Sequence, residues 1–305
     1  MNSARQAVVL LSHIETPMIA RHFARLRRET SGLIDAFFCL HQPQPVPEMT
    51  ANAAVDLVIT ARDGAHLLPH RESERRRGGR PFNRGFNDLI WMPAYLHPQL
   101  TGYDYLWIVE YDVDFAGDWR RFFARTMQSR ADLLSASILP RVQCPQWANW
   151  PGFDCPPEVS SDCQLRMFAP VTRLSRAMRD SYVQSMRESR WRGHFEAVVP
   201  TIARHHGLRI EDLGGNGPFC PPAWRFMNYS HTPVTHIQNA LCGSRATFVF
   251  RPVTHTAYFE DAPEEFDQPD FLYHPVKVGR QRHGQHAQPR EAPLLEPKSV
   301  SSPRK

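Results

Sequence analysis

The stretch that decides the fold, Tyr103–Phe123, reads YDYLWIVEYDVDFAGDWRRFF. Its apolar run Leu106–Val109 is rich in β-forming residues and is bounded by polar ones, which predicts a buried strand. Glu110, Asp112 and Asp114 follow at alternate positions. Because alternate residues of an extended chain point the same way, we expect the three carboxylates to share one face at the end of the strand.

The surroundings of these carboxylates favour a metal site over a solvated acidic turn. Hard divalent cations take oxygen ligands, and Mg²⁺ commonly uses one or two carboxylates together with substrate phosphates. A bare D-x-D pattern is common by chance. Here Gly117 predicts a turn and Asp118 caps a following aromatic helix. This strand–turn–helix setting predicts a divalent ion, Mn²⁺ or Mg²⁺, that holds a diphosphate.

The same segment resembles the metal-binding segment of GT-A-type glycosyltransferases. More narrowly, it is similar to a subgroup of GT-A-like proteins with an E-x-D metal motif, W-x-x-E-x-D-V-x-F/Y-x-G. The residues that match are Trp107, Glu110, Asp112, Val113, Phe115 and Gly117. The pattern leaves the position of Asp114 open, so the working pair is either Glu110/Asp112 or Asp112/Asp114.

The resemblance extends from about Ala7 to Lys277. It implies a GT-A-like, doubly wound (Rossmann-like) mixed α/β sheet in a single domain with long loops. It also implies a nucleotide-diphosphate sugar as the donor substrate.

Composition places the chain among ordinary globular proteins, with 305 residues, 42% hydrophobic and 22% charged. The net charge of +5 comes largely from arginine clusters, which suit a phosphate-bearing ligand or a nucleic acid. The six cysteines include no C-x-x-C pair, and the spacing of Cys144, Cys155 and Cys163 matches no zinc module.

The run Ala7–Leu11 is too short for a secretory leader, so we expect a cytoplasmic protein with reduced thiols. No run approaches the roughly 20 apolar residues of a membrane span, so any membrane contact would be peripheral. The oligomeric state stays open.

Continuously apolar strands alternate with helices in the first third of the chain. The predicted strands are Ala7–Leu11, Ile34–Leu40 and Val55–Thr60, with a helix from Pro17 to about residue 28 after the first. This order predicts a doubly wound α/β sheet.

Ligands of such sheets lie beyond the carboxyl ends of the strands. That places Ser12, His13 and Glu15 near a nucleotide, with an ordinary βα loop as the alternative.

Residues 71–84, RESERRRGGRPFNR, lack apolar periodicity and predict a mobile basic loop. Such a loop either closes over a diphosphate through its arginines or is solvated without a ligand. Residues 86–95 form the apolar side of a predicted helix. By resemblance, Arg84 and Asn87 are candidate nucleotide contacts.

Further strands are predicted at Asp132–Leu139, Phe168–Thr172, Leu208–Leu213 and Thr247–Arg251, and a helix at Ser175–Glu188. The segment Pro140–Asp162 between the first two strands is long and irregular, which is typical of functional loops. Its Trp147 and Trp150 either form a platform for an acceptor sugar or anchor the loop to the body of the protein.

Two later segments carry candidate site residues. Gly193–Thr201 opens a helix with His194 and Glu196 in its first turn, where the helix dipole alone accounts for a carboxylate. The resemblance instead implies that Glu196 contacts the acceptor or acts as base; Asp212 is the alternative base, and His194 is taken as structural.

In Phe271–Lys277 the resemblance implies that His274 completes the metal coordination and that Lys277 meets the diphosphate. Residues 279–305 are polar and rich in Pro and Arg, so we expect a disordered tail after a domain of residues 1–278.

The sequence therefore predicts a metal-dependent glycosyltransferase with an unknown acceptor. Two alternatives remain. A nucleotidyltransferase of similar fold usually carries a glycine- and lysine-rich loop after the first strand, which Ser12–Pro17 lacks. A non-catalytic nucleic-acid- or phosphate-binding protein would explain the arginines but not the carboxylate cluster, and no nucleic-acid partner is expected.

Overall fold

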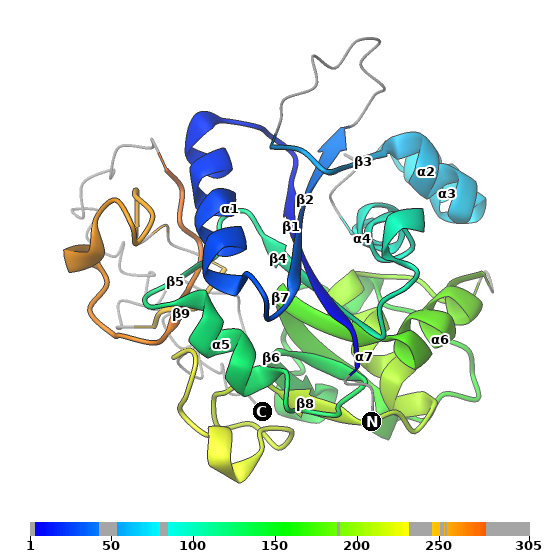
Figure 1. The fold of residues 1–305 in the computed structure, drawn as a ribbon. Helices are drawn as coiled ribbons and strands as arrows, with labels where there is room; N and C mark the ends of the chain where they lie inside the picture. Colours follow the sequence, from blue (N-terminus) through cyan, green and yellow to red (C-terminus); the bar gives the residue numbers. More distant parts are fainter. Residues whose placement is uncertain are drawn as a thin grey trace, which may run out of the picture.

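The structure is a computed structural model that describes residues 4–42, 54–79, 85–187, 190–231, 246–250, 253 and 255–278. Within these residues, seven strands form one sheet in the order β3-β2-β1-β4-β7-β6-β8 (Figure 1). Their bounds are β1 Gln6–Ser12, β2 Asp35–Gln42, β3 Leu57–Thr60, β4 Tyr105–Glu110, β6 Leu133–Pro140, β7 Leu165–Ser175 and β8 Ile210–Asp212.

The sheet is mixed because β7 runs antiparallel to both of its neighbours, β4 and β6. The other pairs, β1–β2, β1–β4, β2–β3 and β6–β8, are parallel. This arrangement confirms the predicted fold class, an α/β doubly wound mixed sheet. Since all strands but β7 share one direction, the loops after β1, β4, β6 and β8 meet at one edge of the sheet.

Helices cover both faces of the sheet (Figure 1). One face carries α1 Pro17–Thr30 and α5 Trp119–Thr126; the other side carries α2 Ala61–Leu67, α3 Pro69–Arg77, α4 Asp88–Tyr95, α6 Arg176–Arg187 and α7 Phe195–His205. Helix α1 begins as predicted, because Pro17 follows a Thr16 N-cap whose hydroxyl accepts the Ile19 amide at 3.2 Å.

The central strands are buried on both faces, which is why they read as continuous apolar runs. Val8 of β1 and Val109 of β4 pack with the α1 and α5 side chains in one core layer. Val9 and Ile108 point the other way and pack with α4, α6 and α7. The core therefore has two layers, one on each side of the sheet.

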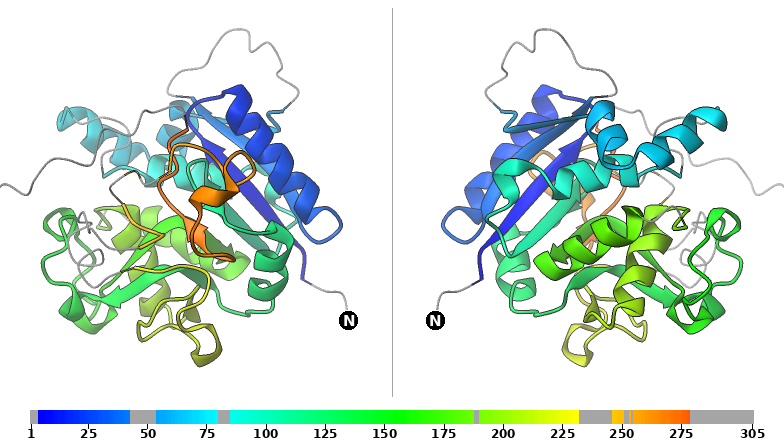
Figure 2. Two further views of the ribbon diagram at one scale, coloured as in Figure 1. Left: turned by 90° about the vertical axis from the view of Figure 1, so that its left-hand side faces the viewer. Right: turned by 90° about the vertical axis from the view of Figure 1, so that its right-hand side faces the viewer.

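A second, two-stranded sheet is formed by β5 Asp114–Phe115 and β9 Leu272–Tyr273, which pair antiparallel. The Ala116 amide donates to Phe271 O at 2.9 Å, and the Val276 amide donates to Asp112 O at 2.8 Å. The end of the described chain is thus paired with the segment that follows β4. Figure 2 shows this late segment, drawn in orange, crossing beside α1.

The prediction of a loop at residues 71–84 is wrong for residues 71–77, because α3 extends to Arg77. Glu72 pairs with Arg75 at 2.7 Å and with Arg76 at 2.6 Å, and Arg71 pairs with Glu74 at 2.6 Å. Ion pairs three and four positions apart support a helix that has no apolar stripe. Residues 80–84 lie outside the described part of the chain.

One other expectation fails, and one choice between two alternatives is decided. The described residues 247–250 form no strand; Phe248 only bridges to His274. Trp147 and Trp150 are 1% and 3% exposed and pack with Cys144 and Ala197, so they anchor the loop and the platform reading is wrong. The predicted tail at 279–305 lies outside the described residues, and the boundary at residue 278 stays a prediction.

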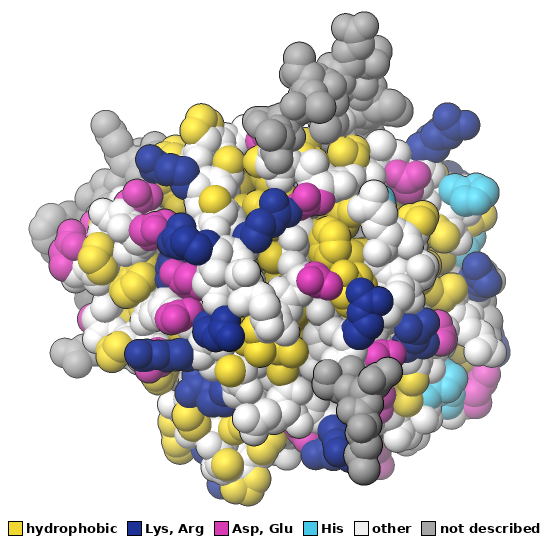
Figure 3. All heavy atoms as spheres, viewed as in Figure 1, with side chains coloured by type: hydrophobic (Ala, Val, Ile, Leu, Met, Phe, Trp, Pro, Cys, Tyr) yellow, Lys and Arg dark blue, Asp and Glu magenta, His cyan; other side chains and the backbone are white. Residues whose placement is uncertain are grey.

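The face over α1 and α5 mixes basic and acidic side chains (Figure 3). Arg28 pairs with Glu260 at 2.9 Å, and Arg21 lies 3.5 Å from Asp261. The arginines of α1 on this face are therefore matched by acids rather than forming a uniformly basic surface. Among the described helices, none combines the length and the apolar character that a bilayer span requires.

Candidate metal centre

The candidate site begins where β4 ends. Glu110 is the last residue of β4, between β1 and β7 in the sheet order. The Tyr111 amide still donates to Leu11 O at 3.0 Å, but the Val113 amide turns back to Glu110 O at 3.0 Å. The chain therefore leaves the sheet in a tight turn that places Asp112 directly beyond the strand.

Three side chains converge at this turn. Glu110, Asp112 and His274 each offer a ligand atom, and these atoms all lie within 4.8 Å of one another. His274 Nε2 is 3.6 Å from Asp112 Oδ2 and 4.0 Å from Glu110 Oε2. We call these three residues the metal group. His274 reaches it because β9 pairs with β5 immediately before it.

The orientation of the His274 ring defines its chemistry. Nδ1 lies 2.6 Å from Val249 O, and since a carbonyl only accepts, Nδ1 carries the proton and donates it there. Burial lowers the pKa of His274, so the ring is neutral and Nε2 presents a lone pair to the two carboxylates. A hydrogen bond from the other ring nitrogen to a carbonyl is the arrangement by which proteins orient histidine ligands of metals.

Negative charge is concentrated in the metal group. Burial, together with the negative charges of Asp112 and Glu196, raises the pKa of Glu110 above its usual range. Asp112 is 4% exposed, and its Oδ1 has no hydrogen-bond partner among the described residues. Two carboxylates and an imidazole lone pair that face one another fit a divalent cation, which would relieve their mutual repulsion.

Lys277 provides a nearby positive charge. Its ammonium forms an ion pair with Asp112 and donates to the Tyr111 hydroxyl at 3.2 Å. The Lys277 ammonium also lies 4.8 Å from the centroid of the Tyr111 ring. Tyr111 thus holds Lys277 at the metal group. The sequence interpretation missed Tyr111, because nothing in the alternating E-Y-D pattern indicates a role for the residue between the two carboxylates.

Glu196 lies within electrostatic reach of the metal group, since its charge contributes to the pKa values of Glu110 and His274. It is buried in the first turn of α7, where Oε1 accepts the Ala169 amide at 3.0 Å. His194 caps the helix through its Nδ1, which accepts the Glu196 amide at 3.3 Å. The Oε2 atom is 3.5 Å from the same ring nitrogen.

Asp212, the alternative base, has a structural environment. Its carboxylate is buried and accepts the Ile138 amide at 2.8 Å, the Gly214 amide at 3.0 Å and the Tyr229 hydroxyl at 2.7 Å. These bonds hold a bulge in β6 where Ser137 has φ of 53°. Burial raises the pKa of Asp212 to about 7. The role of Asp212 as the alternative base stays a prediction.

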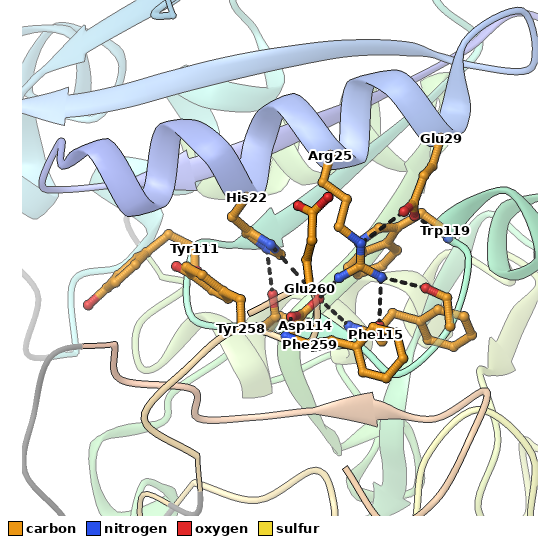
Figure 4. Close-up of polar contacts among 12 residues, drawn as sticks. His22, Arg25, Glu29, Tyr111, Asp114, Phe115, Trp119, Tyr258, Phe259 and Glu260 are labelled. Carbon is orange, nitrogen blue, oxygen red and sulfur yellow. Dashed lines mark hydrogen bonds and ion pairs between the residues drawn. The ribbon is translucent and has the colours of Figure 1, made fainter. Parts of the chain in front are cut away.

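Asp114 does not join Glu110 and Asp112, so the expectation that three carboxylates share one face is wrong. The turn at Tyr111–Val113 breaks the extended chain, and Asp114 begins β5 instead. Its side chain is fully buried and pairs with Arg25 at 2.9 Å (Figure 4). The structure brings together the pair Glu110/Asp112, not Asp112/Asp114.

The loop after β1 lies beside this turn, because β1 and β4 are parallel neighbours that end at the same edge of the sheet. Ser12 Oγ donates to Ile14 O at 2.5 Å and closes the loop. The His13 ring packs edge-on to Tyr111 at 5.2 Å between ring centroids, and its partial desolvation and then Lys277 lower the pKa of His13. Glu15 Oε1 is buried without a hydrogen-bond partner among the described residues.

Of the two other candidate nucleotide contacts, Asn87 precedes α4 and does not cap it through its side chain. Its Oδ1 is buried and has no hydrogen-bond partner within the described residues. Arg84 lies outside the described residues.

Comparisons with known proteins give only weak similarities. No family model and no curated protein matches the chain. Among solved structures, the mannosyltransferase Ktr4p from S. cerevisiae matches with a TM-score of 0.40 and 11% identity, over 69% of this chain and 68% of that one. Ktr4p in complex with GDP matches with a TM-score of 0.36, 10% identity, and coverage of 67% and 66%. Glucosyl-3-phosphoglycerate synthase from Mycobacterium tuberculosis matches with a TM-score of 0.26 and 16% identity, over 44% of this chain and 43% of that one.

Proposed function

We propose that this protein is a metal-dependent glycosyltransferase that transfers a sugar from a nucleotide-diphosphate sugar to an acceptor hydroxyl. The observation that carries the proposal is the convergence of Glu110, Asp112 and His274 at the end of β4. In open α/β sheets, ligands bind beyond the carboxyl ends of the strands, where this group lies. The two carboxylate ligands suit Mn²⁺ or Mg²⁺.

In this proposal the metal group holds the ion, and the bound ion supplies charge neutralisation to the departing diphosphate. Lys277 adds a second positive charge beside Asp112. The β1 loop residues Ser12, His13 and Glu15 bind the nucleotide, with Arg84 and Asn87 as further contacts.

Glu196 acts on the acceptor side. If the reaction inverts configuration, its carboxylate takes the proton of the acceptor hydroxyl; if configuration is retained, it orients the acceptor. The oxygen proposed for this role is Oε2, which lies 3.5 Å from His194 Nδ1, since Oε1 accepts the Ala169 amide.

A thermal-shift experiment tests the proposal. UDP- and GDP-sugars are expected to raise the unfolding temperature only when Mn²⁺ is present, because the metal group would hold an ion whose positive charge favours binding of the diphosphate. A short single-stranded oligonucleotide serves as the comparison. A shift with the oligonucleotide that fades with salt, and none with nucleotide sugars, would contradict the proposal in favour of a nucleic-acid-binding protein. A metal-dependent shift with nucleoside triphosphates alone would favour a nucleotidyltransferase.

Mn²⁺ affinity is expected to rise with pH. The pKa of Glu110 is raised to about 8, first by burial and then by Asp112 and Glu196, so below that pH the ion must displace a proton. We therefore expect the dissociation constant to fall by up to about tenfold per pH unit between pH 6 and pH 8. Titration calorimetry at each pH measures it, and Glu110→Gln should bind more weakly with a flatter pH profile. A wild-type affinity that is constant over this range would be the contrary result.

A further inference from the structure

Hydrogen bonds from distant parts of the chain hold the turn that carries Asp112. Beyond β4 the segment 111–117 contains only the two-residue strand β5, yet its carbonyl oxygens are bound by donors from distant elements (Figure 4). Tyr258 Oη donates to Tyr111 O at 2.8 Å, and His22 Nε2 lies 3.0 Å from Val113 O. The Val276 amide binds Asp112 O at 2.8 Å.

Arg25 binds two carbonyl oxygens of this segment. It comes from α1, is 2% exposed, and donates through Nη2 to Phe115 O at 3.0 Å and to Gly117 O at 2.5 Å. Its Nη1 donates to Asp114 at 2.9 Å and its Nε to Glu29 at 2.9 Å. A planar guanidinium with a partner on every nitrogen is fixed in orientation, so it fixes the backbone that it binds.

Asp114 joins three segments of the chain. Oδ1 accepts Arg25 and the Phe115 amide at 2.7 Å, and Oδ2 accepts the Phe259 amide at 2.6 Å. In the register of the small sheet, Asp114 lies opposite Tyr273, the residue before His274. Asp114 therefore lies two residues after Asp112 and directly across the small sheet from the residue that precedes His274.

We propose that Arg25, Asp114 and Tyr258 are positioning residues. Together they hold Asp112 and His274 at the spacing that a cation requires. This inference rests on the proposed metal site. Asp114 does not touch the ion; it acts through the backbone of 111–117 and through β9. Partners of this kind outside the ligand sphere typically change metal affinity by 10–100-fold when they are altered.

The test compares two buried arginines that each bind backbone carbonyls. Arg25→Lys keeps the charge but loses the fork that binds Phe115 O and Gly117 O. The matched control is Arg173→Lys in β7, since buried Arg173 binds Ser129 O at 3.0 Å and Ala131 O at 2.9 Å before β6, away from the metal group. The measurements are the Mn²⁺ dissociation constant, by calorimetry, and hydrogen exchange of the peptide covering 111–118 in the metal-free protein.

Arg25→Lys is expected to weaken Mn²⁺ binding at least about tenfold and to accelerate exchange of the 111–118 amides. Arg173→Lys should change the dissociation constant less than about twofold, even at an equal loss of thermal stability. Equal Mn²⁺ affinity in wild type and Arg25→Lys would overturn the positioning role and leave the metal site standing. Wild-type protein that binds no Mn²⁺ would overturn both.

A milder variant decides the question if Arg25→Lys does not fold. Tyr258→Phe removes only the donor to Tyr111 O and keeps the ring stacked on His22, at 4.1 Å between centroids. It should weaken Mn²⁺ binding measurably, by about threefold, with little loss of stability. Unchanged affinity in this variant would overturn the positioning role. Intact Mn²⁺ binding without nucleotide-sugar turnover would overturn the proposed function alone.

Discussion

Asp112→Asn is expected to lower the kcat/KM of nucleotide-sugar turnover at least about 10³-fold while the protein stays folded. Asp112 stands at the centre of the metal group, because its Oδ2 lies 3.6 Å from His274 Nε2 and also contacts Lys277. The amide cannot supply the negative charge that offsets a divalent ion. Several kcal/mol of charge stabilisation at the diphosphate should be lost with it.

The measurement is hydrolysis of a nucleotide sugar at saturating Mn²⁺. Asp118→Asn is the matched control: Asp118 is exposed, follows the same turn, and caps α5 by accepting the Arg120 amide at 2.7 Å. Asparagine caps helices about as well as aspartate, so this variant should retain full activity. Turnover that survives Asp112→Asn would remove Asp112 from the mechanism.

Asp114→Ala is expected to destabilise the folded protein strongly. Removing one partner of a buried ion pair typically costs about 3–5 kcal/mol, and Asp114 is the buried partner of Arg25. The Phe115 and Phe259 amides would also lose their acceptor. Against a typical total stability of about 5–15 kcal/mol, this is a large fraction. Denaturant unfolding of the metal-free protein measures it, and Asp112→Asn should change the same free energy far less.

A double-mutant cycle separates the ion pair from general packing. Arg25→Met combined with Asp114→Ala leaves no buried charge without a partner, so its destabilisation should be smaller than the sum of the single variants by at least about 1 kcal/mol. Strictly additive losses would show that Arg25 and Asp114 do not stabilise the fold as a pair.

Local sequence patterns correctly predicted the elements that depend only on residues close together in the chain. The apolar run Leu106–Val109 is a buried strand, and Asp118 caps the helix after it. The alternation rule failed after Glu110, because it assumes an extended chain and the turn at Asp112 ends that extension. Residues 71–77 were missed for a different reason, since ion pairs rather than an apolar stripe support α3.

Long-range pairing could not be read from periodicity. Nothing local to residues 271–277 shows that β9 pairs with β5, and only the resemblance to GT-A-type glycosyltransferases proposed His274 beside the carboxylates. The role of Arg25 was equally invisible, because its partners Asp114 and Gly117 lie about ninety positions along the chain. A buried arginine inside an amphipathic helix gives the same pattern as a solvated one.

The pairing of β9 with β5 has a consequence for biosynthesis. Lys277 and Asp112, which form an ion pair, are 165 positions apart in the chain. During translation, the sheet and the carboxylates of Glu110 and Asp112 emerge from the ribosome long before His274 does. The nascent chain therefore cannot assemble the complete metal group until almost all of the described chain has been made, and a chain terminated before residue 272 would lack His274.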